Sequence, residues 1–247
     1  MKVRAKVAYD GTDFVGFQRQ AAQRGRTVQG ELETALERVC RSRVTVIGAG
    51  RTDAGVHATG QVIAFEVDWK HPLDALGRAL NAALPDDVAV RDLELCEADF
   101  HPRFSAKTRT YVYTAYVSAV RQPLLRRFAW QLERWPDLAV MNEAARRLIG
   151  RHDFAAFGSP PSGRAEETTV REVLRADWQC ADDRLWFTIE ANAFLFRMVR
   201  RVVMALVRTG WGECDPDVIE AMLESRDAQR IKGLAPACGL CLVDVKY

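Results

Sequence analysis

Residues 48–61, GAGRTDAGVHATGQ, contain a single acid, Asp53, which follows Arg51 and precedes the small residues Ala54 and Gly55. A carboxylate on a tight, glycine-flanked turn could act as a nucleophile or as a general base. A guanidinium nearby would keep that carboxylate ionised. An aspartate that only caps a turn or a helix is the more common arrangement. The local chemistry leaves both interpretations open.

The same stretch superficially matches a phosphate-binding loop. Gly48 and Gly50 fit the first two glycines of GxGxxG, but the third position is Asp53, whose carboxylate would repel a pyrophosphate. The residues beyond it alternate like a strand and do not have the apolar period of a helix. No Gly-Lys-Ser/Thr follows either, so the sequence predicts no nucleotide cofactor.

Other catalytic and metal-binding patterns are absent from the sequence. There is no GxSxG motif, and the four histidines show no HExxH spacing. His57 and His152 are expected to be loop hydrogen-bonders. CGLC at 238–241 has CxxC spacing but no second pair of ligands, and the alternation after it predicts a closing strand. We therefore expect no metal site and six free thiols.

The composition is that of an ordinary globular protein. The chain has 247 residues, a net charge of +2, 48% apolar and 28% charged residues. No apolar run approaches the roughly 20 residues that a membrane span needs, and the start lacks the apolar core of a signal peptide. We expect a cytoplasmic protein. Arginines greatly outnumber lysines, which suits phosphate recognition and equally suits a G+C-rich genome.

Hydrophobic periodicity predicts a mixed α+β fold. Helical patterns follow Val28 and Pro72, a third segment runs from Pro136 to Gly150, and Asp215-Pro216 resembles a helix start. Strict strand–helix alternation is missing, which argues against a doubly wound parallel sheet. Residues 158–169 read as a long polar loop. Alternating strands are predicted at 2–9, 61–67, 88–95, 110–117, 184–190 and 240–246.

The segment 192–209 predicts an amphipathic helix. Arg197, Arg201 and Arg208 fall opposite its apolar arc, whereas Arg200 lies at the margin of that arc. A half-buried charge needs a partner. The alternative is a side chain that lies along the apolar surface and keeps its guanidinium in water.

Several longer motifs together resemble one known family. They are YDGTDFVGFQRQ (9–20), GAGRTDAGVHATGQV (48–62), NAALPDDVAV (81–90), FHPRFSAKTRTYVY (100–113), GRHDFAAF (150–157), FLFRMVR (194–200) and APACGLCL (235–242). In this order the motifs resemble the TruA-type tRNA pseudouridine synthases over nearly the whole chain. Met204, where the family usually has glycine, and TTVREV (168–173) depart from the family pattern, which affects local packing and RNA contacts more than the reaction.

The resemblance implies roles for individual residues. Asp53 would be the catalytic aspartate, and Arg51 would help to displace the target base. Tyr111 would pack on the target uracil, Arg200 would pair with the aspartate, and Leu240 would wall the pocket.

The resemblance also implies an architecture and a partner. The family fold is α+β, with a mixed, largely antiparallel central sheet flanked by helices, in two pseudo-symmetric halves with a cleft between them. Residues 1–104 would carry the aspartate and residues 105–247 would complete the site. The enzyme would be a homodimeric isomerase that needs no cofactor and modifies uridines 38, 39 and 40 in the anticodon arm of tRNA.

Arginine clusters would contact that RNA. Arg19, Arg24 and Arg26 form one cluster, Arg197 and Arg201 lie on the predicted helix with Arg208, and Arg121, Arg126 and Arg127 form a third. Taken singly, each cluster is more often a solvated surface. Two other classes remain as alternatives: an RNA-binding or folding-assisting protein with a vestigial pocket, and a redox or nucleotide-binding enzyme.

Overall fold

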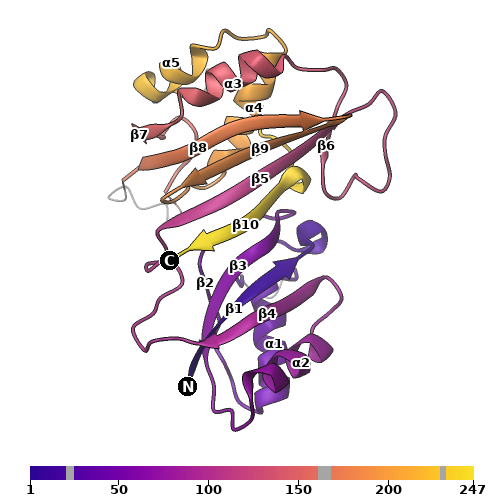
Figure 1. Ribbon diagram of the computed structural model, residues 1–247, viewed down its shortest axis with the longest axis vertical. Helices are drawn as coiled ribbons and strands as arrows, with labels where there is room; N and C mark the ends of the chain where they lie inside the picture. The colour runs from indigo at the N-terminus through magenta and orange to yellow at the C-terminus, as the bar shows by residue number, and fades with distance from the viewer. Residues whose placement is uncertain (21–24, 161–167, 229–231) are drawn as a thin grey trace. The chain divides into compact units, whose positions relative to one another are not determined.

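The computed structural model describes residues 1–20, 25–160, 168–228 and 232–247. They form two compact units, drawn in Figure 1. Unit 1 comprises Met1–Lys107 and Cys241–Tyr247, and unit 2 comprises Thr108–Leu240. The end of the first segment lies close to the predicted division at 104. The C-terminal strand pairs with a strand of unit 1.

Unit 1 has a sheet in the order β4-β1-β3-β10. β1 pairs antiparallel with β3 and β4, whereas β10 pairs parallel with β3, and the short β2 adds to β3. The inward residues of β1, such as Val3 and Val7, are fully buried, as period-two alternation requires. The strands are β1 (Lys2–Tyr9), β2 (Ile47–Gly48), β3 (His57–Glu66), β4 (Val88–Leu95) and β10 (Leu240–Lys246).

Two helices pack on each other beside this sheet (Figure 1). α1 (Val28–Cys40) begins after Thr27, whose hydroxyl accepts from the Gly30 N–H at 3.2 Å; such a cap satisfies one of the orphan donors of a helix start. α2 (Leu73–Ala83) follows Pro72. Leu32, Leu36, Leu76 and Leu80 are almost completely buried, so the apolar faces of both helices supply the core of unit 1.

The strands of unit 2 follow the order β5-β9-β8-β7, with β6 parallel to β5. The other pairs are antiparallel, and β8 and β9 form a hairpin. The strands are β5 (Thr108–Val117), β6 (Trp130–Leu132), β7 (Gly150–Asp153), β8 (Val170–Ala181) and β9 (Arg184–Ala191). The mixed, largely antiparallel α+β fold predicted from the sequence is thereby confirmed.

Three helices accompany the strands of unit 2 in the described part of the chain, and α3 packs against both α4 and β8 (Figure 1). They are α3 (Leu138–Arg146), α4 (Met198–Gly210) and α5 (Val218–Ser225). The Asp137 carboxylate caps α3 by accepting from the N–H groups of Ala139 and Val140 at 2.9 and 3.1 Å. None of the helices within the described ranges is long and apolar enough to cross a membrane.

Two predicted helix starts are wrong. α4 begins at Met198 and not at 192, because Phe196 bridges to Ser159 and Arg197 adopts a left-handed conformation at φ 63°. Arg197 therefore leaves the helical stripe of Arg201 and Arg208. α5 begins at Val218, and Asp217, not Asp215, stands at its start. Most of the predicted loop 158–169 lies outside the described residues.

The β3–β10 pairing depends on a residue without a side chain. A Cβ on Gly60 would lie 2.0 Å from the carbonyl oxygen of Val243 in β10, and a backbone atom cannot move aside cheaply. We expect Gly60→Ala to lower the free energy of unfolding by at least about 2 kcal/mol, measured by urea denaturation.

Gly77→Ala is the matched control in the same unit. Gly77 lies in α2, and its Cβ would meet the Leu93 side chain at an ordinary contact distance of 3.5 Å. The change should therefore raise the free energy of unfolding by about 0.5–1 kcal/mol. Equal effects of the two substitutions would contradict the assignment of Gly60 to a close backbone contact.

Candidate active site

Asp53 lies on the loop that joins β2 to β3 in unit 1. Its side chain is half-buried, and the neighbouring Arg51 and Ala54 are exposed. Gly55 follows in a left-handed conformation at φ 78°, which closes the turn tightly. The carboxylate is therefore presented beside an open surface and is not sealed in the core of the unit.

The N-terminal segment 9–17 holds one side of this loop. The Tyr9 hydroxyl and the Thr52 Oγ1 lie 2.8 Å apart in a buried hydrogen bond. The Phe17 N–H donates to the Thr52 carbonyl at 3.1 Å, and the Gly55 N–H donates to the Phe14 carbonyl at 3.3 Å. These bonds fix the residue before Asp53 and the turn that follows it.

Close backbone approach explains the glycines of the same segment. A Cβ on Gly11 would lie 2.0 Å from the Val56 carbonyl oxygen. Gly16 has φ +120°, and its Cβ would lie 2.8 Å from the Thr52 carbonyl oxygen. A side chain at either position would push the Asp53 loop away. The motif YDGTDFVGF is therefore a support for the loop.

β3 holds the other side of the loop. Gln61 is fully buried, and its Nε2 donates to the Gly50 carbonyl at 2.9 Å. The Ala49 N–H donates to the Val62 carbonyl at 2.8 Å. Gln61 was missed from the sequence, although its place in a strand directly after the glycine-rich turn was visible there.

His57 is a structural residue of the loop. Its side chain is buried, and Nδ1 accepts from the Gly11 N–H at 2.9 Å. The same Nδ1 lies 3.2 Å from a carboxylate oxygen of Asp10, so the ring holds the segment before Gly11 as well. His152 Nε2 lies 3.0 Å from the Ile149 carbonyl oxygen. Both histidines are hydrogen-bonded, as predicted, but they lie in the strands β3 and β7 and not in loops.

Tyr111 belongs to unit 2, on β5. It pairs with Ile189 of β9, and 8% of its surface is exposed. Its ring meets Phe194 edge-on, with the ring centroids 5.1 Å apart, an arrangement that stabilises aromatic pairs. The sheet and Phe194 thus determine the orientation of the Tyr111 ring.

Arg200 lies in the first turn of α4 and is half-buried. Its Nε donates to the Ala235 carbonyl at 2.8 Å, and the Ala235 N–H donates to the Arg200 carbonyl at 3.2 Å. The expectation that this charge needs a partner is met in part by the segment before β10. Asp53 belongs to the other unit, and its pairing with Arg200 stays a prediction.

Tyr113 also holds the segment before β10. Its hydroxyl donates to the Pro236 carbonyl at 2.9 Å, and its ring fills the space beside Gly239. Burial raises the pKa of Tyr113 well above its ordinary value, so the hydroxyl remains a donor. Leu240, 5% exposed, follows directly. Sequence reasoning missed Tyr113, although it shares the inward side of β5 with Tyr111.

The cysteines are free thiols, as predicted. Burial raises the pKa of both Cys238 and Cys241, which makes them poor nucleophiles and poor metal ligands. Within the described ranges, no three His, Cys, Asp or Glu side chains are placed to hold a metal ion.

The sequence matches known proteins along nearly its whole length. A family model described as tRNA pseudouridine synthase matches residues 5–105 and 144–247. The chain belongs to the tRNA pseudouridine synthase family. It is 44% identical to the tRNA pseudouridine synthase A of Syntrophotalea carbinolica over 99% of this chain and 96% of the relative. It is 42% identical to that of Pseudothermotoga lettingae over 98% of both chains.

Membership of the tRNA pseudouridine synthase family confirms the predicted isomerase. Asp53, Arg51, Arg200 and Leu240 fall within the matched residues, whereas Tyr111 lies in the unmatched stretch 106–143. The family match identifies the reaction class, and the roles of these individual residues stay predictions.

The predicted RNA-binding arginines differ in their surroundings. Arg19 donates to Glu33 at 2.8 Å. Arg26 binds Glu31 and Asp87 and lies 4.5 Å over the Phe14 ring, and these carboxylates raise its pKa. Arg24 lies outside the described residues. Arg197 is exposed and stacks on Phe196 at 4.7 Å, and Arg201 is half-buried.

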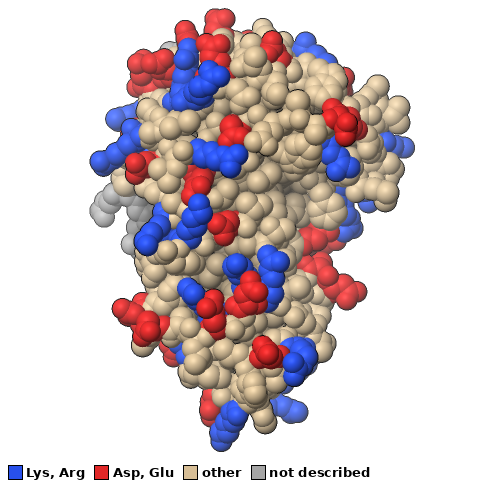
Figure 2. Space-filling view, viewed as in Figure 1, with Lys and Arg blue, Asp and Glu red and all other residues tan. Residues whose placement is uncertain are grey.

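The face shown in Figure 2 carries basic and acidic side chains interspersed with each other. Among the described residues on that face, Lys and Arg gather into no continuous basic surface. Phosphate contacts on this face would therefore come from individual arginines.

Gln61 provides a test of the loop support. Gln61→Met keeps the volume but removes the amide that holds the Gly50 carbonyl, which leaves that half-buried oxygen without this donor. We expect about 1–2 kcal/mol of lost stability and at least about a tenfold fall in kcat for pseudouridine formation, because Asp53 is less firmly positioned. Urea denaturation and tritium release from tRNA labelled at uracil C5 measure the two effects.

Gln179→Met is the control, because Gln179 is exposed and bonds only locally to Asp177 among the described contacts. It should change neither quantity. A Gln61→Met enzyme with wild-type kcat would show that the Gly50 bond does not position Asp53.

Proposed function

We propose that this chain converts uridine to pseudouridine in the anticodon arm of tRNA, with Asp53 as the essential group. Family membership supports the reaction class. The observation that carries the residue assignment is the loop itself. It holds one half-buried carboxylate beside an open surface, while hydrogen bonds from segment 9–17 and from β3 fix the backbone on both sides.

The reaction breaks the bond between uracil N1 and ribose C1′, turns the base, and joins C5 to the same sugar carbon. Nothing is oxidised and no group is imported. Asp53 acts either as a nucleophile at C1′, as a nucleophile at uracil C6, or as a base that forms a glycal. A single ionised carboxylate suits each path.

The target base must leave the stack before a side chain reaches its sugar. In this proposal Arg51 occupies the vacated space, which suits an exposed guanidinium next to the reactive loop. Tyr111 offers an oriented aromatic ring to the uracil, Leu240 walls the pocket, and Arg200 pairs with Asp53. A guanidinium partner would keep the carboxylate ionised for all three paths.

The finer assignments follow from the family resemblance. We propose that uridines 38, 39 and 40 are the substrates and that the enzyme works in the cytoplasm as a homodimer. Residues 1–104 would act as the domain of the aspartate and residues 105–247 as the domain that completes the site.

Asp53→Asn tests the assignment. The amide fits the same space but cannot act as nucleophile or base, so pseudouridine formation should fall at least about 1,000-fold, while tRNA affinity stays within about twofold. Tritium release and filter binding measure the two quantities. Asp68→Asn, an exposed acid in the same unit, should leave both unchanged. Turnover retained by Asp53→Asn would refute the proposal.

The arginines make a second test. Arg197 is exposed and stacked on an aromatic ring, so we expect Arg197→Gln to lower the slope of log Kd against log salt by about one. Arg26 is engaged by two carboxylates, so Arg26→Gln should cost stability and leave that slope unchanged. A lower slope for Arg26→Gln and an unchanged slope for Arg197→Gln would show that Arg26, and not Arg197, contacts a phosphate.

A further inference from the structure

The turn at residues 101–105, HPRFS, presents an aromatic ring to solvent. Phe104 is 75% exposed, far more than any other aromatic side chain among the described residues. Exposing a phenylalanine forgoes about 2 kcal/mol of burial, and lone apolar residues on a surface are common. What distinguishes Phe104 is how its backbone and its ring are held.

The turn is fixed by its own side chains. The Ser105 N–H donates to the His101 carbonyl at 2.8 Å, and the His101 N–H donates to the Ser105 hydroxyl at 3.1 Å. His101 Nδ1 accepts from the N–H groups of Arg103 and Phe104 at 3.2 and 3.3 Å. The backbone of Phe104 is therefore positioned without any burial of its ring.

The C-terminal residue anchors the turn to the rest of unit 1. The Tyr247 hydroxyl donates to the Pro102 carbonyl at 2.9 Å, and the Tyr247 ring packs on Phe100 with centroids 4.9 Å apart. The Lys107 N–H donates to the Lys246 carbonyl at 2.8 Å. The segment 100–107 is thus held by Lys246, the last residue of β10, and by Tyr247, which follows it.

The ring has polar and cationic neighbours. The His101 imidazole lies 4.3 Å from it, centroid to centroid, at 35°. The Arg103 guanidinium lies 5.5 Å from its centroid, close to the limit of about 6 Å for a cation–π contact. Residues 100–109 contain Arg103, Lys107 and Arg109 and no acid. An exposed aromatic ring beside a cationic side chain is the arrangement that binds single-stranded nucleic acid.

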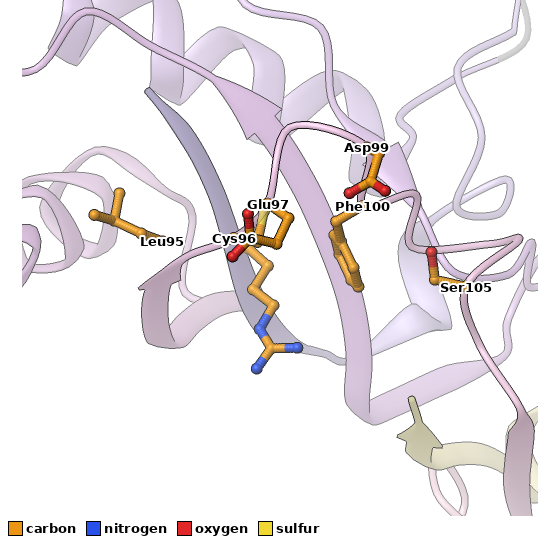
Figure 3. Close-up of a pocket in the computed structure, with 7 residues that line it drawn as sticks. Leu95, Cys96, Glu97, Asp99, Phe100 and Ser105 are labelled. Carbon is orange, nitrogen blue, oxygen red and sulfur yellow. The ribbon is translucent and has the colours of Figure 1, made fainter.

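A shallow pocket of about 340 Å³ adjoins the turn through Phe100 and Ser105 (Figure 3). Arg4, Glu97 and Asp99 also line it, so its carboxylates outnumber its guanidinium and it is a poor site for a phosphate. The phosphates of a nucleic acid near this turn would therefore lie along Arg103 and Lys107, and one of its bases could stack on the Phe104 ring.

We propose that Phe104 is a stacking platform for an unpaired tRNA base other than the target uridine, with Arg103 on the adjoining phosphate. This inference rests on the proposed function for its substrate class. A platform outside the reactive loop would help to orient the tRNA relative to Asp53, because unstacked bases are the parts of an RNA that proteins read.

The test measures the affinity of the full-length protein for an unmodified tRNA transcript by fluorescence anisotropy. Phe104→Ala and Phe104→Leu should each weaken Kd about fivefold to a hundredfold, since both lose the aromatic face. Phe104→Tyr should stay within about twofold of wild type. Leu95→Ala, which removes an aliphatic side chain 61% exposed in the same unit, is the matched control and should change nothing.

Three results would overturn the proposal. Phe104→Ala could bind tRNA as tightly as wild type. Phe104→Leu could retain full affinity, which would show that apolar area and not stacking matters. Phe104→Ala could change the sedimentation coefficient of the free protein, which would assign the ring to a contact with a second copy of the chain.

The platform and the proposed function fail separately. A wild-type protein that binds tRNA but releases no tritium refutes the function and leaves the Phe104 comparison valid. An active wild type with an unaffected Phe104→Ala variant refutes the platform alone. Arg103→Gln, expected to lower the salt slope by about one, tests the phosphate contact independently.

Discussion

The backbone of the Asp53 loop is held between the N-terminal segment, which approaches it too closely for side chains at two glycines, and β3, and the rest of unit 1 supports this contact. Gly11 and Gly16 let the N-terminal segment reach the loop, and Gln61 holds its other side from β3. β1 ends at Tyr9, so the sheet delivers that segment directly to Thr52. In the proposed role, a carboxylate on such a loop would need little reorganisation before reaction, and positioning of this kind contributes substantially to rate.

In unit 2, polar side chains hold the segment that precedes Leu240. Arg200 and Tyr113 both bind carbonyl groups in the segment 235–236, immediately before Leu240. The Nε of Arg200 makes this backbone contact. Because the guanidinium is planar, the contact also fixes the direction of its two terminal nitrogens. A planar guanidinium held at one edge is well oriented for a carboxylate at another. The same residue can thus support the segment before the strand and present a directed charge.

Much of the fold could be predicted because the signals were local. β1, β4 and β10 have the predicted bounds, since each alternates strictly or ends at a turn. The start of α4 was wrong because the bridge from Phe196 to Ser159 is a tertiary contact. Four strands were missed, among them β8, whose burial does not alternate regularly. Of the candidate site, the glycine-flanked motif made Asp53 a candidate and the family resemblance implied its role, which stays a prediction. Gln61 and Tyr113 bind partners that only the folded chain brings to them.

The contrast between arginines shows why charge alone is a poor guide to an RNA surface. Arg26 lies in a predicted basic cluster, yet Glu31 and Asp87 compensate its charge and Phe14 covers it, so it acts as a structural cross-link. Arg103 was assigned to no cluster, yet it lies beside an exposed ring on a turn fixed by four hydrogen bonds. Each cation that contacts a phosphate adds affinity by releasing counterions from the nucleic acid. An exposed aromatic ring adds affinity when its backbone is already ordered, because less entropy is lost on binding.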